Sequence, residues 1–352
     1  MSFRRVAGEG ALAIGAHLGN GMALVVRQEV IGQDVILRYR LAIPVNRITG
    51  VIGRRPLAGM AAGTIFGSFG GNPVAGIQVH ECAMGEPFEK YRVTPGTRVR
   101  LDRIATDATD LSPDKKAARK ELKACRKLID QLLGRLAAEQ ERSLLVILQG
   151  VDASGKDGAI RKVFTGVNPQ HCKVVSFKEP DREERLHDYL WRIYRALPAR
   201  GELGVFNRSH YEDAIVLQAR GELSKKDALV RLRQIAEVER TWAENRIVPI
   251  KFFLHVSREE QKRRFEARLD KPEKHWKLQE SDFKDRKLWP KFMAAYDEAL
   301  SHTATKQAPW YIIPADHKWY RDLAIARIIG ATLKGMHPRL PKPKLDLDRF
   351  KL

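Results

Sequence analysis

The sequence predicts an α/β protein in which a doubly wound parallel sheet of about five strands is flanked by helices. Beyond residue 143, short apolar runs alternate with longer segments of helical periodicity, a pattern typical of consecutive β-α units. The run at 144–148, LLVIL, is continuously apolar, as expected for a parallel strand that is covered on both faces. A glycine turn and a helix follow this run, and the rest of the chain is organised around them.

The glycine turn has the spacing of a phosphate-binding loop, or P-loop. Gly150 is followed at the GxxxxGK interval by Gly155 and Lys156. In such a loop, glycines let backbone N–H groups approach phosphate oxygens, and the lysine reaches the transferring phosphate. The positive end of the following helix adds to the attraction. The residues expected to bind phosphate or nucleotide here are Gly150, Ser154, Gly155, Asp157 and Gly158.

One position departs from the usual P-loop pattern. The Ser or Thr hydroxyl that normally binds magnesium after the lysine is replaced by Asp157. Asp152, inside the loop, is the candidate metal ligand instead. The alternative interpretation, a tight turn with no ligand between a strand and a helix, remains open on the residues of this segment alone.

Length, cysteine usage and hydropathy limit the class of protein. The 352 residues suffice for one large domain or two modest ones. Cys82, Cys125 and Cys172 are scattered and odd in number, so we expect neither a disulfide framework nor a zinc site. No charge-free apolar run reaches the roughly 18 residues of a membrane helix. We therefore expect a cytoplasmic protein with no membrane partner.

The chain is strongly basic, with a net charge of +20 from 63 Lys and Arg against 43 Asp and Glu. Such an excess favours a polyanionic partner, but nucleic acid, an acidic membrane and inorganic polyphosphate would all be attracted. Residues 1–83 hold 8 Lys or Arg and 4 Asp or Glu, so the later residues carry +16 of this charge. Charge alone does not distinguish these partners.

Residues 1–83 differ in composition from the rest, being rich in Gly, Ala and Val. Our hypothesis is that Met84 is the true start of the protein and that this part comes from an upstream reading frame. A small β-rich extension is the alternative. Residues 84–352 form the expected phosphotransferase domain, and residues 85–112 are expected to be an extended, basic lead-in on its surface.

The periodicity of the sequence predicts the order of elements in this domain. A helix should begin at Ser112-Pro113-Asp114 and run to about Gln140. Further strands are predicted at 173–177, 203–206, 248–256 and 310–314. Helices are predicted at about 182–196, 210–242, 258–269, 282–301 and 317–335. In such a sheet, ligands bind beyond the carboxyl ends of the strands.

Polar side chains follow two of these strands. Lys178 comes after the second run, where it could meet an anion held by the loop, although a solvated charge is an equal alternative. The third run ends in Asn207-Arg208, where P-loop phosphotransferases commonly place a metal-binding acid and a charge-neutralising arginine. Glu212 or Asp213 could complete a metal site with Asp152. The alternative is that Ser209 caps a helix and both acids face solvent.

The segment 258–290 is predicted to form a helical lid. It holds a dense set of cations: Lys262, Arg263, Arg264, Arg268, Lys271, Lys274 and Lys277. Such a segment could close over phosphates, whereas a solvated helix face is the alternative. Trp276, Trp289 and Trp310 are expected to belong to the core.

With these residues in view, the chain resembles the polyphosphate kinase 2 family, P-loop phosphotransferases that use inorganic polyphosphate with nucleotides. The resemblance covers about residue 86 to the carboxyl terminus. It is carried by six ordered segments: GVDASGKDG at 150–158, SFKEP at 176–180, HDYLWRIYR at 187–195, GVFNRSHYED at 204–213, KHWK at 274–277 and APWYIIPADHKWYR at 308–321.

The resemblance implies a P-loop kinase-like fold and specific roles. Asp152 and Lys156 correspond to the loop acid and lysine, Arg208 to the arginine after the second motif, and Arg268 to the lid arginine. Many family members have Asp where this chain has Asn207. The Asn form followed by Tyr-Glu-Asp is similar to the subgroup that phosphorylates nucleoside monophosphates as well as diphosphates.

Together these observations predict a Mg²⁺-dependent, in-line phosphoryl transfer between polyphosphate and AMP or ADP. The expected catalytic residues are Asp152, Lys156, Arg208 and Arg268. The expected metal ligands are Asp152 and Glu212. Beyond the loop, the residues expected to bind phosphate or nucleotide are Lys178, Asn207, Lys271 and Lys274. Adenine nucleotides are the expected partners, with guanine as the alternative base. We expect a homo-oligomer. An ATP-dependent small-molecule or nucleoside monophosphate kinase and a nucleic-acid-binding protein are the competing functions.

Overall fold

A computed structural model describes the backbone of residues 4–8, 11–18, 22–31 and 34–42, and residues 89–110, 112, 114–343 and 345 with their side chains. The chain divides into two compact units, Met1–Ala75 and Gly76–Leu352, which we describe separately.

In the first unit, four strands form an antiparallel sheet in the order β1-β2-β3-β4. They are β1 (Arg4–Gly8), β2 (Ala11–Leu18), β3 (Met22–Ile31) and β4 (Asp34–Ala42). The expected start at Met84 lies outside the described residues, so the hypothesis on residues 1–83 stays a prediction.

The second unit contains the predicted five-stranded parallel sheet, in the order β6-β7-β5-β8-β9. The strands are β5 (Ser143–Gln149), β6 (Cys172–Ser176), β7 (Leu203–Asn207), β8 (Ile247–His255) and β9 (Trp310–Pro314). Each begins and ends within one residue of its predicted range. All seven residues of β5 are buried, as its apolar sequence predicted. The α/β fold class is confirmed.

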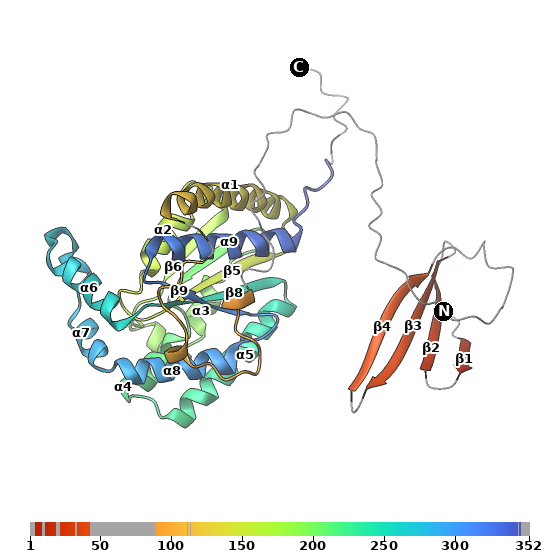
Figure 1. Cartoon of the computed structure of the whole chain (residues 1–352), viewed down its shortest axis with the longest axis horizontal. Coiled ribbons are helices and arrows are strands. Elements are labelled where there is room, and N and C mark those ends of the chain that lie inside the picture. The colour runs from red at the N-terminus through yellow and green to blue at the C-terminus, as the bar shows by residue number, and fades with distance from the viewer. Residues whose placement is uncertain are drawn as a thin grey trace, which may run out of the picture. The chain divides into compact units, whose positions relative to one another are not determined.

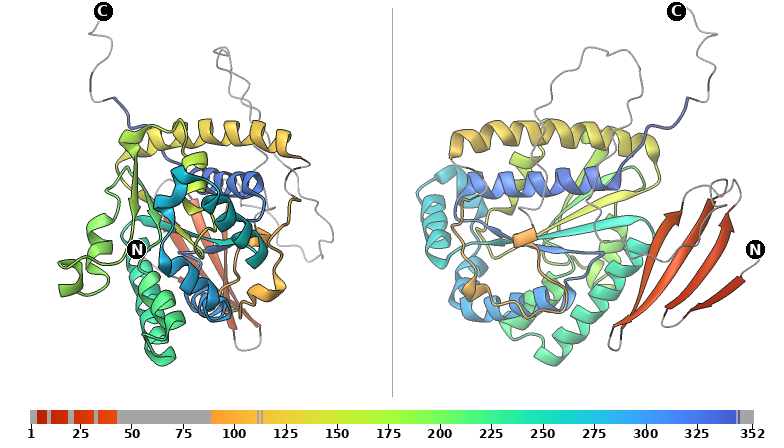
Figure 2. Two further views of the ribbon diagram at one scale, coloured as in Figure 1. Left: turned by 90° about the vertical axis from the view of Figure 1, so that its left-hand side faces the viewer. Right: turned by 45° about the vertical axis from the view of Figure 1, so that its right-hand side comes forward.

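Helices cover both faces of this sheet (Figure 1). On one face lie α1 (Lys115–Glu139), α2 (Lys156–Val163) and α9 (Lys318–Met336). On the other lie α4 (Glu212–Arg220), α5 (Lys225–Glu244) and α8 (Trp289–Thr303). The two views in Figure 2 show the same two layers with the sheet between them. With both faces covered, the carboxyl ends of the strands are where a ligand is expected to bind in such a sheet.

Three predicted helices are divided or shortened. The segment 210–242 is two helices, because Gly221 ends α4 in the left-handed conformation (φ 81°) and the Ser224 side chain caps α5. The segment 282–301 is also two helices, which meet at Leu288 before Pro290. Of 182–196, only α3 (Trp191–Ala196) and a single 3-10 turn at Glu184–Leu186 are helical.

The lead-in is more buried than predicted. Tyr91, Val93, Val99 and Leu101 are all buried, and the Val93 N–H donates to the Trp310 carbonyl at 2.9 Å. Arg92 also forms an antiparallel bridge with Tyr311. The expectation of a surface segment holds for most of the described lead-in, but it is wrong for these four side chains, which join the core.

A buried ion pair lies inside the core, between the sheet and the helices on one of its faces. The Lys251 ammonium of β8 pairs with Glu239 of α5, and it also donates to the Tyr211 hydroxyl at 3.0 Å and the Thr303 carbonyl at 2.8 Å. All of these side chains are fully buried. The pair joins β8, α5 and the turn after β7.

We expect Lys251→Met to destabilise the protein by about 3–5 kcal/mol, because it leaves the Glu239 carboxylate buried without its cation. Denaturant unfolding measures this loss. The exposed Lys284, which pairs with Glu280, is the matched control, and Lys284→Met should change the free energy of unfolding by less than about 0.5 kcal/mol. Adding Glu239→Gln to Lys251→Met should recover part of the lost stability. Equal losses of unfolding free energy in Lys251→Met and Lys284→Met would contradict the expectation.

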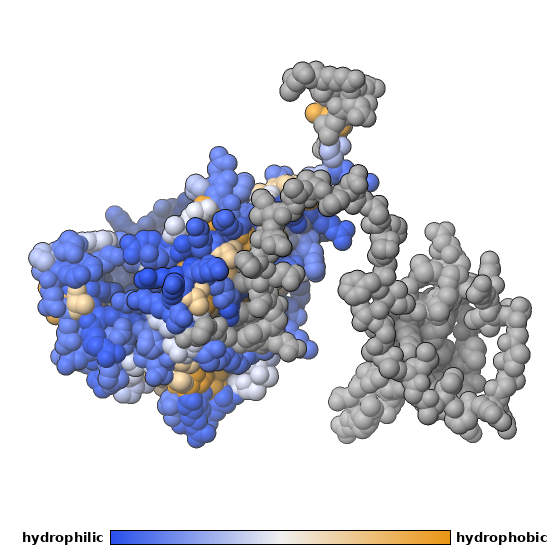
Figure 3. Space-filling view, turned by 45° about the horizontal axis from the view of Figure 1, so that its top comes forward, coloured by the Kyte–Doolittle hydropathy of each residue, from blue (hydrophilic) through white to orange (hydrophobic). Residues whose placement is uncertain are grey.

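The surface of the described residues is mainly hydrophilic in the view of Figure 3, with scattered apolar side chains. Within these residues, no helix combines the length and the apolar character needed to cross a bilayer.

Candidate active site

The phosphate-binding loop joins β5 to α2, as the sequence predicted. Gly150 and Gly155 have φ angles of 149° and 101°, in the range that strongly favours glycine. A Cβ atom at Gly155 would also lie 2.0 Å from Nη1 of Arg321. The loop therefore needs glycine at this position both for its backbone conformation and for the close approach of an arginine.

Lys156 is the first residue of α2, and its side chain folds back over the loop. Its ammonium donates to the carbonyl oxygens of Gly150 at 2.6 Å and Val151 at 3.2 Å. Only 7% of the residue is exposed. Burial, followed by the nearby charge of Arg208, lowers the pKa of Lys156 to about 8.

This lowered pKa predicts a pH dependence. Since the charged ammonium is the form that attracts phosphate, kcat/KM should fall as the pH rises through about 8, well below the ordinary lysine value of 10.5. The kcat/KM profile is the relevant one because it reports groups of the free enzyme. An alkaline limb that begins only above about pH 10, the ordinary range of lysine, would contradict the assignment.

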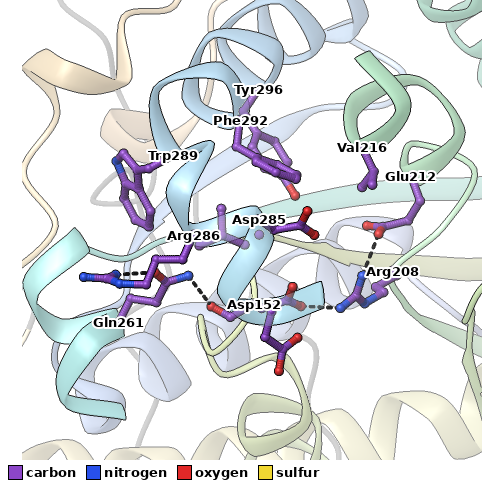
Figure 4. Close-up of a pocket in the computed structure, with 13 residues that line it drawn as sticks. Asp152, Arg208, Glu212, Val216, Gln261, Asp285, Arg286, Trp289, Phe292 and Tyr296 are labelled. Atoms are coloured by element: carbon purple, nitrogen blue, oxygen red, sulfur yellow. Dashed lines mark hydrogen bonds and ion pairs between the residues drawn. The ribbon is translucent and has the colours of Figure 1, made fainter. Parts of the chain in front are cut away.

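Arg208 follows β7 and lies between two carboxylates. The β7 strand is adjacent to β5, and the Arg208 N–H donates to the Leu148 carbonyl at 3.0 Å. Its guanidinium donates to Asp152 through Nη2 and to Glu212 through Nη1, the latter at 2.8 Å. Figure 4 shows Arg208 between these two acids. Glu212, together with Asp152, raises the pKa of Arg208, so the guanidinium stays charged.

Asp152 is the residue on which the other charges converge. Burial acts to raise its pKa, but Arg208, Lys156 and Arg268 outweigh burial and hold the pKa of Asp152 below its ordinary value. The carboxyl group of Asp282 lies close enough to share a hydrogen bond with it. Burial and the charge of Asp152 raise the pKa of Asp282 to about 6.

These carboxylates fit a magnesium ion that is held jointly by protein and substrate. Within the part of the chain that the structure describes, no three His, Cys, Asp or Glu side chains form a cage for a cation. Mg²⁺ is commonly bound through one or two carboxylates together with substrate phosphates. The neighbouring acids Asp152 and Asp282 match that requirement. Arg208 pairs with both Asp152 and Glu212, so Mg²⁺ would compete with this arginine for either carboxylate.

The lid consists of α6 (Arg258–Leu269), a 3-10 turn at Pro272–Lys277 and α7 (Glu280–Lys287). These elements project from the domain beside the loop (Figures 1 and 2). The Lys277 ammonium lies 3.4 Å from the Asp157 carboxylate, which also accepts a hydrogen bond from the Asn207 amide at 2.8 Å. The tip of the lid therefore reaches the first turn of α2.

Trp276 contradicts the expectation for the tryptophans. It lies at the tip of the lid and is 77% exposed, whereas Trp310 is fully buried and Trp289 is partly buried against the core. Trp276 is exposed because it lies on the projecting 3-10 turn, where its indole N–H is bonded to the Glu273 carbonyl of the same turn.

A cleft opens beside the loop, between α4, α6, α7 and α8. Its floor contains Asp152, Arg208 and Glu212, and its walls include Val216, Trp289, Phe292 and Tyr296. In Figure 4, Phe292 and Tyr296 lie together above Asp152 and Arg208, and Trp289 lies to one side near Arg286. Arg220 of α4 holds the Asp285 carboxylate of α7 in a bidentate pair at 2.9 and 2.8 Å, which fixes one wall.

The structure brings together most of the predicted site residues. These residues lie around the carboxyl ends of β5 and β7. From the loop and the start of α2 they are Gly150, Asp152, Ser154, Gly155, Lys156, Asp157 and Gly158. From β7, α4 and the lid they are Asn207, Arg208, Glu212 and Arg268. Lys178 and Lys271 are exposed. Lys274 is half-buried and its charge acts on Lys318.

The sequence did not indicate several residues that contact the loop but lie far from it in the chain. Asp282 lies beside Asp152, and Gln261, Arg264 and Arg321 donate to carbonyls of the loop. Arg264 was noted only as one cation of the lid. Gln261 and Arg264 are three residues apart on one helix, and this spacing was the only sequence feature that could have indicated a shared buried face.

Three features define a P-loop kinase-like phosphotransferase. They are the strand order, the glycine loop after the central strand, and the lysine at the start of the next helix. A sequence model described as Polyphosphate kinase 2 (PPK2) matches residues 112–341. The chain belongs to this family.

Known proteins support the assignment along most of the chain. The AMP/ADP-polyphosphate phosphotransferase of Meiothermus ruber is 42% identical over 264 residues, which are 75% of this chain and 99% of the relative. The ADP-polyphosphate phosphotransferase of Rhodopseudomonas palustris is 36% identical, over 72% of this chain and 92% of the relative. The crystal structure of polyphosphate kinase 2 from Arthrobacter aurescens TC1 has a TM-score of 0.72 at 34% identity, over 76% of this chain and 95% of that one.

Proposed function

We propose that this protein transfers a phosphoryl group between inorganic polyphosphate and a nucleoside mono- or diphosphate, converting AMP or ADP to ADP or ATP and operating in both directions. The observation that carries the proposal is the convergence of Lys156, Arg208 and Arg268 on Asp152 beside the loop. The names of the Meiothermus ruber and Rhodopseudomonas palustris relatives support both AMP and ADP as acceptors.

The arrangement suits direct in-line transfer. The attacking group is a phosphate oxygen that is already anionic, so no strong base is needed and catalysis is mainly positioning and charge neutralisation. Lys156 and the loop N–H groups bind phosphate oxygens, and Arg208 and Arg268 neutralise charge on the transferring group. Mg²⁺, when bound, would neutralise further phosphate charge, and Asp152 together with the neighbouring Asp282 would hold it.

The cleft beside the loop is the place we propose for the nucleoside. Val216, Trp289, Phe292 and Tyr296 line this cleft with apolar side chains. The cleft is narrow, with an accessible volume of about 20 Å³, so we propose that the lid opens before a purine ring enters. Arg208 on the floor of the cleft would then lie between the nucleoside and the loop. Guanine nucleotides fit the same description, and the GDP-polyphosphate phosphotransferase of Pseudomonas aeruginosa, 37% identical over half of this chain, acts on that base according to its name.

One assay separates this function from an ATP-dependent kinase. AMP or ADP is incubated with polyphosphate and Mg²⁺, and no ATP is added. We expect ATP to form, and chelation of Mg²⁺ should stop its formation. Formation of product only when ATP is supplied would favour the ATP-dependent kinase instead.

The nucleic-acid-binding alternative has its own test. Binding to duplex or single-stranded DNA that persists above ~200 mM salt and is not displaced by polyphosphate would favour it, because nonspecific phosphate contacts weaken steeply with salt. Homo-oligomer formation and a cytoplasmic location stay predictions.

A further inference from the structure

Two polar side chains of α6 are buried against the phosphate-binding loop. Gln261 is 2% exposed and Arg264 is 7% exposed, although the neighbouring cations Lys262 and Arg263 of the same helix face solvent. They are three residues apart, so they lie on the same face of the helix. This face of the lid's first helix is in contact with the loop.

Gln261 and Arg264 donate to three consecutive carbonyl groups of the loop. The Gln261 amide donates to the Asp152 carbonyl at 2.9 Å. Nη1 of Arg264 donates to the carbonyls of Ala153 at 3.0 Å and Ser154 at 2.7 Å. Figure 4 shows the Gln261 contact.

These contacts determine the direction of the loop's N–H groups. In a planar trans peptide, a carbonyl and the N–H of the next residue point in opposite directions. Holding the carbonyls of Asp152 and Ser154 toward α6 therefore turns the N–H groups of Ala153 and Gly155 away from it. The expected phosphate position lies on that opposite side.

Arg264 uses all of its donors in this arrangement. Nε donates to Glu260 at 2.9 Å, and Nη2 donates to the carbonyls of Ala315 at 2.5 Å and Asp316 at 3.2 Å, just after β9. A guanidinium has five N–H groups, so every one is occupied. A lysine has only three donors at a single point and could not join the loop, α6 and the end of β9 in the same way.

Gln261 also connects the loop to the second helix of the lid. Its Oε1 accepts a hydrogen bond from Nη1 of Arg286 at 2.6 Å, and Arg286 donates to the Arg258 carbonyl at 2.9 Å as well. Arg286 of α7, Gln261 of α6 and Asp152 of the loop thus form one chain of hydrogen bonds, as Figure 4 shows.

We propose that Gln261 and Arg264 are positioning residues that hold the phosphate-binding loop in its transfer-competent conformation. On this proposal, α6 is a fixed support of the loop, and the closing part of the lid begins beyond Leu269. The expected loss of phosphoryl transfer rests on the proposed function, whereas the expected loosening of the loop does not depend on it.

The test compares three variants with the wild type. Gln261→Glu keeps an acceptor for Arg286 and removes the donor to Asp152, and it also adds a negative charge that faces the Arg286 guanidinium. Arg264→Met removes all five donors at similar length. Arg263→Met, an exposed neighbour on the same helix, is the matched control. Hydrogen–deuterium exchange of the substrate-free protein should be faster at residues 150–156 in the first two variants and unchanged in the control.

The kinetic expectation follows from the same geometry. With polyphosphate and ADP, kcat should fall about tenfold in Gln261→Glu, the loss of one hydrogen bond, and about 100-fold in Arg264→Met, as a displaced site predicts. The KM for ADP should change less than about threefold in Arg264→Met, because Arg264, unlike Gln261, does not line the proposed nucleoside cleft. Arg264→Lys should recover only part of the kcat lost in Arg264→Met.

Wild-type exchange at residues 150–156 in both variants would overturn the proposal. So would faster exchange throughout the domain with a matching loss of thermal stability in Gln261→Glu, since that result indicates a general structural role. If the wild type lacks polyphosphate-dependent activity, the proposed function fails, and the exchange experiment still decides whether α6 supports the loop.

Discussion

Replacing Lys156 with methionine is expected to lower polyphosphate-dependent kcat by about 10²–10³-fold, equivalent to roughly 2.7–4 kcal/mol of transition-state stabilisation. The ammonium is buried and bonded to the Gly150 and Val151 carbonyls, so it is held where phosphate oxygens should bind. Methionine retains the length of the side chain and removes the charge. The rate of ATP formation from ADP and polyphosphate measures the effect.

Lys162→Met provides the control for this variant. Lys162 lies on the same helix, α2, and is exposed, so its replacement should leave kcat within about twofold, as expected for a surface change. Thermal unfolding of Lys156→Met should remain cooperative. Near-normal turnover of Lys156→Met would refute the role that we assign to the loop lysine.

Replacing Arg208 with methionine is expected to have an effect of similar size, about 10²–10³-fold on kcat. The substitution removes a charge from the transferring group and also leaves the acids Asp152 and Glu212 without their shared partner. The two carboxylates would then repel an incoming polyanion. The apparent affinity for polyphosphate should therefore fall together with kcat.

Arg208→Lys separates these two effects. A lysine supplies the charge, but its single ammonium cannot donate to both carboxylates as the forked guanidinium does. We expect it to recover part of the affinity and little of kcat. Arg200→Met, at an exposed arginine shortly before β7, is the matched control; a loss in Arg200→Met as large as that in Arg208→Met would contradict a specific role of Arg208.

The sequence was sufficient to predict the parallel sheet and the loop because both depend on local patterns. An uninterrupted apolar run as short as 144–148, followed directly by a glycine turn, suits a buried strand better than a helix. The GxxxxGK spacing likewise determines a turn whose shape depends on its own glycines. Arg208 could be placed beside the loop because β5 and β7 are adjacent in a sheet of this kind, a consequence of topology that requires no side-chain detail.

Helix boundaries were predicted less well, since single residues decide them. Gly221 and Ser224 divide a segment whose apolar periodicity continues on both sides. Similarly, the Asp188 carboxylate accepts a hydrogen bond from the Leu190 N–H at 2.9 Å, which competes with helix formation before Trp191. Periodicity reports which face is buried, but it does not report where the backbone changes direction.

The charged residues of the lid show the limit of sequence reasoning about the site. Arg263 and Arg264 are adjacent and chemically identical, yet the first faces solvent and the second lies beneath the loop. Which of two neighbouring cations is buried depends on how α6 packs against β9 and the loop, through contacts with residues more than 50 positions away. No pattern within the helix contains that information.

The contact of Val93 with Trp310 has a consequence for assembly. Unpaired strand edges invite addition of a strand from another molecule, and the lead-in occupies the outer side of β9. Within the described residues of the parallel sheet, the outer side of β6 has no pairing partner, and Val174 on that strand is 46% exposed. Within the described parallel sheet, β6 is therefore the edge to which a strand of another copy could add.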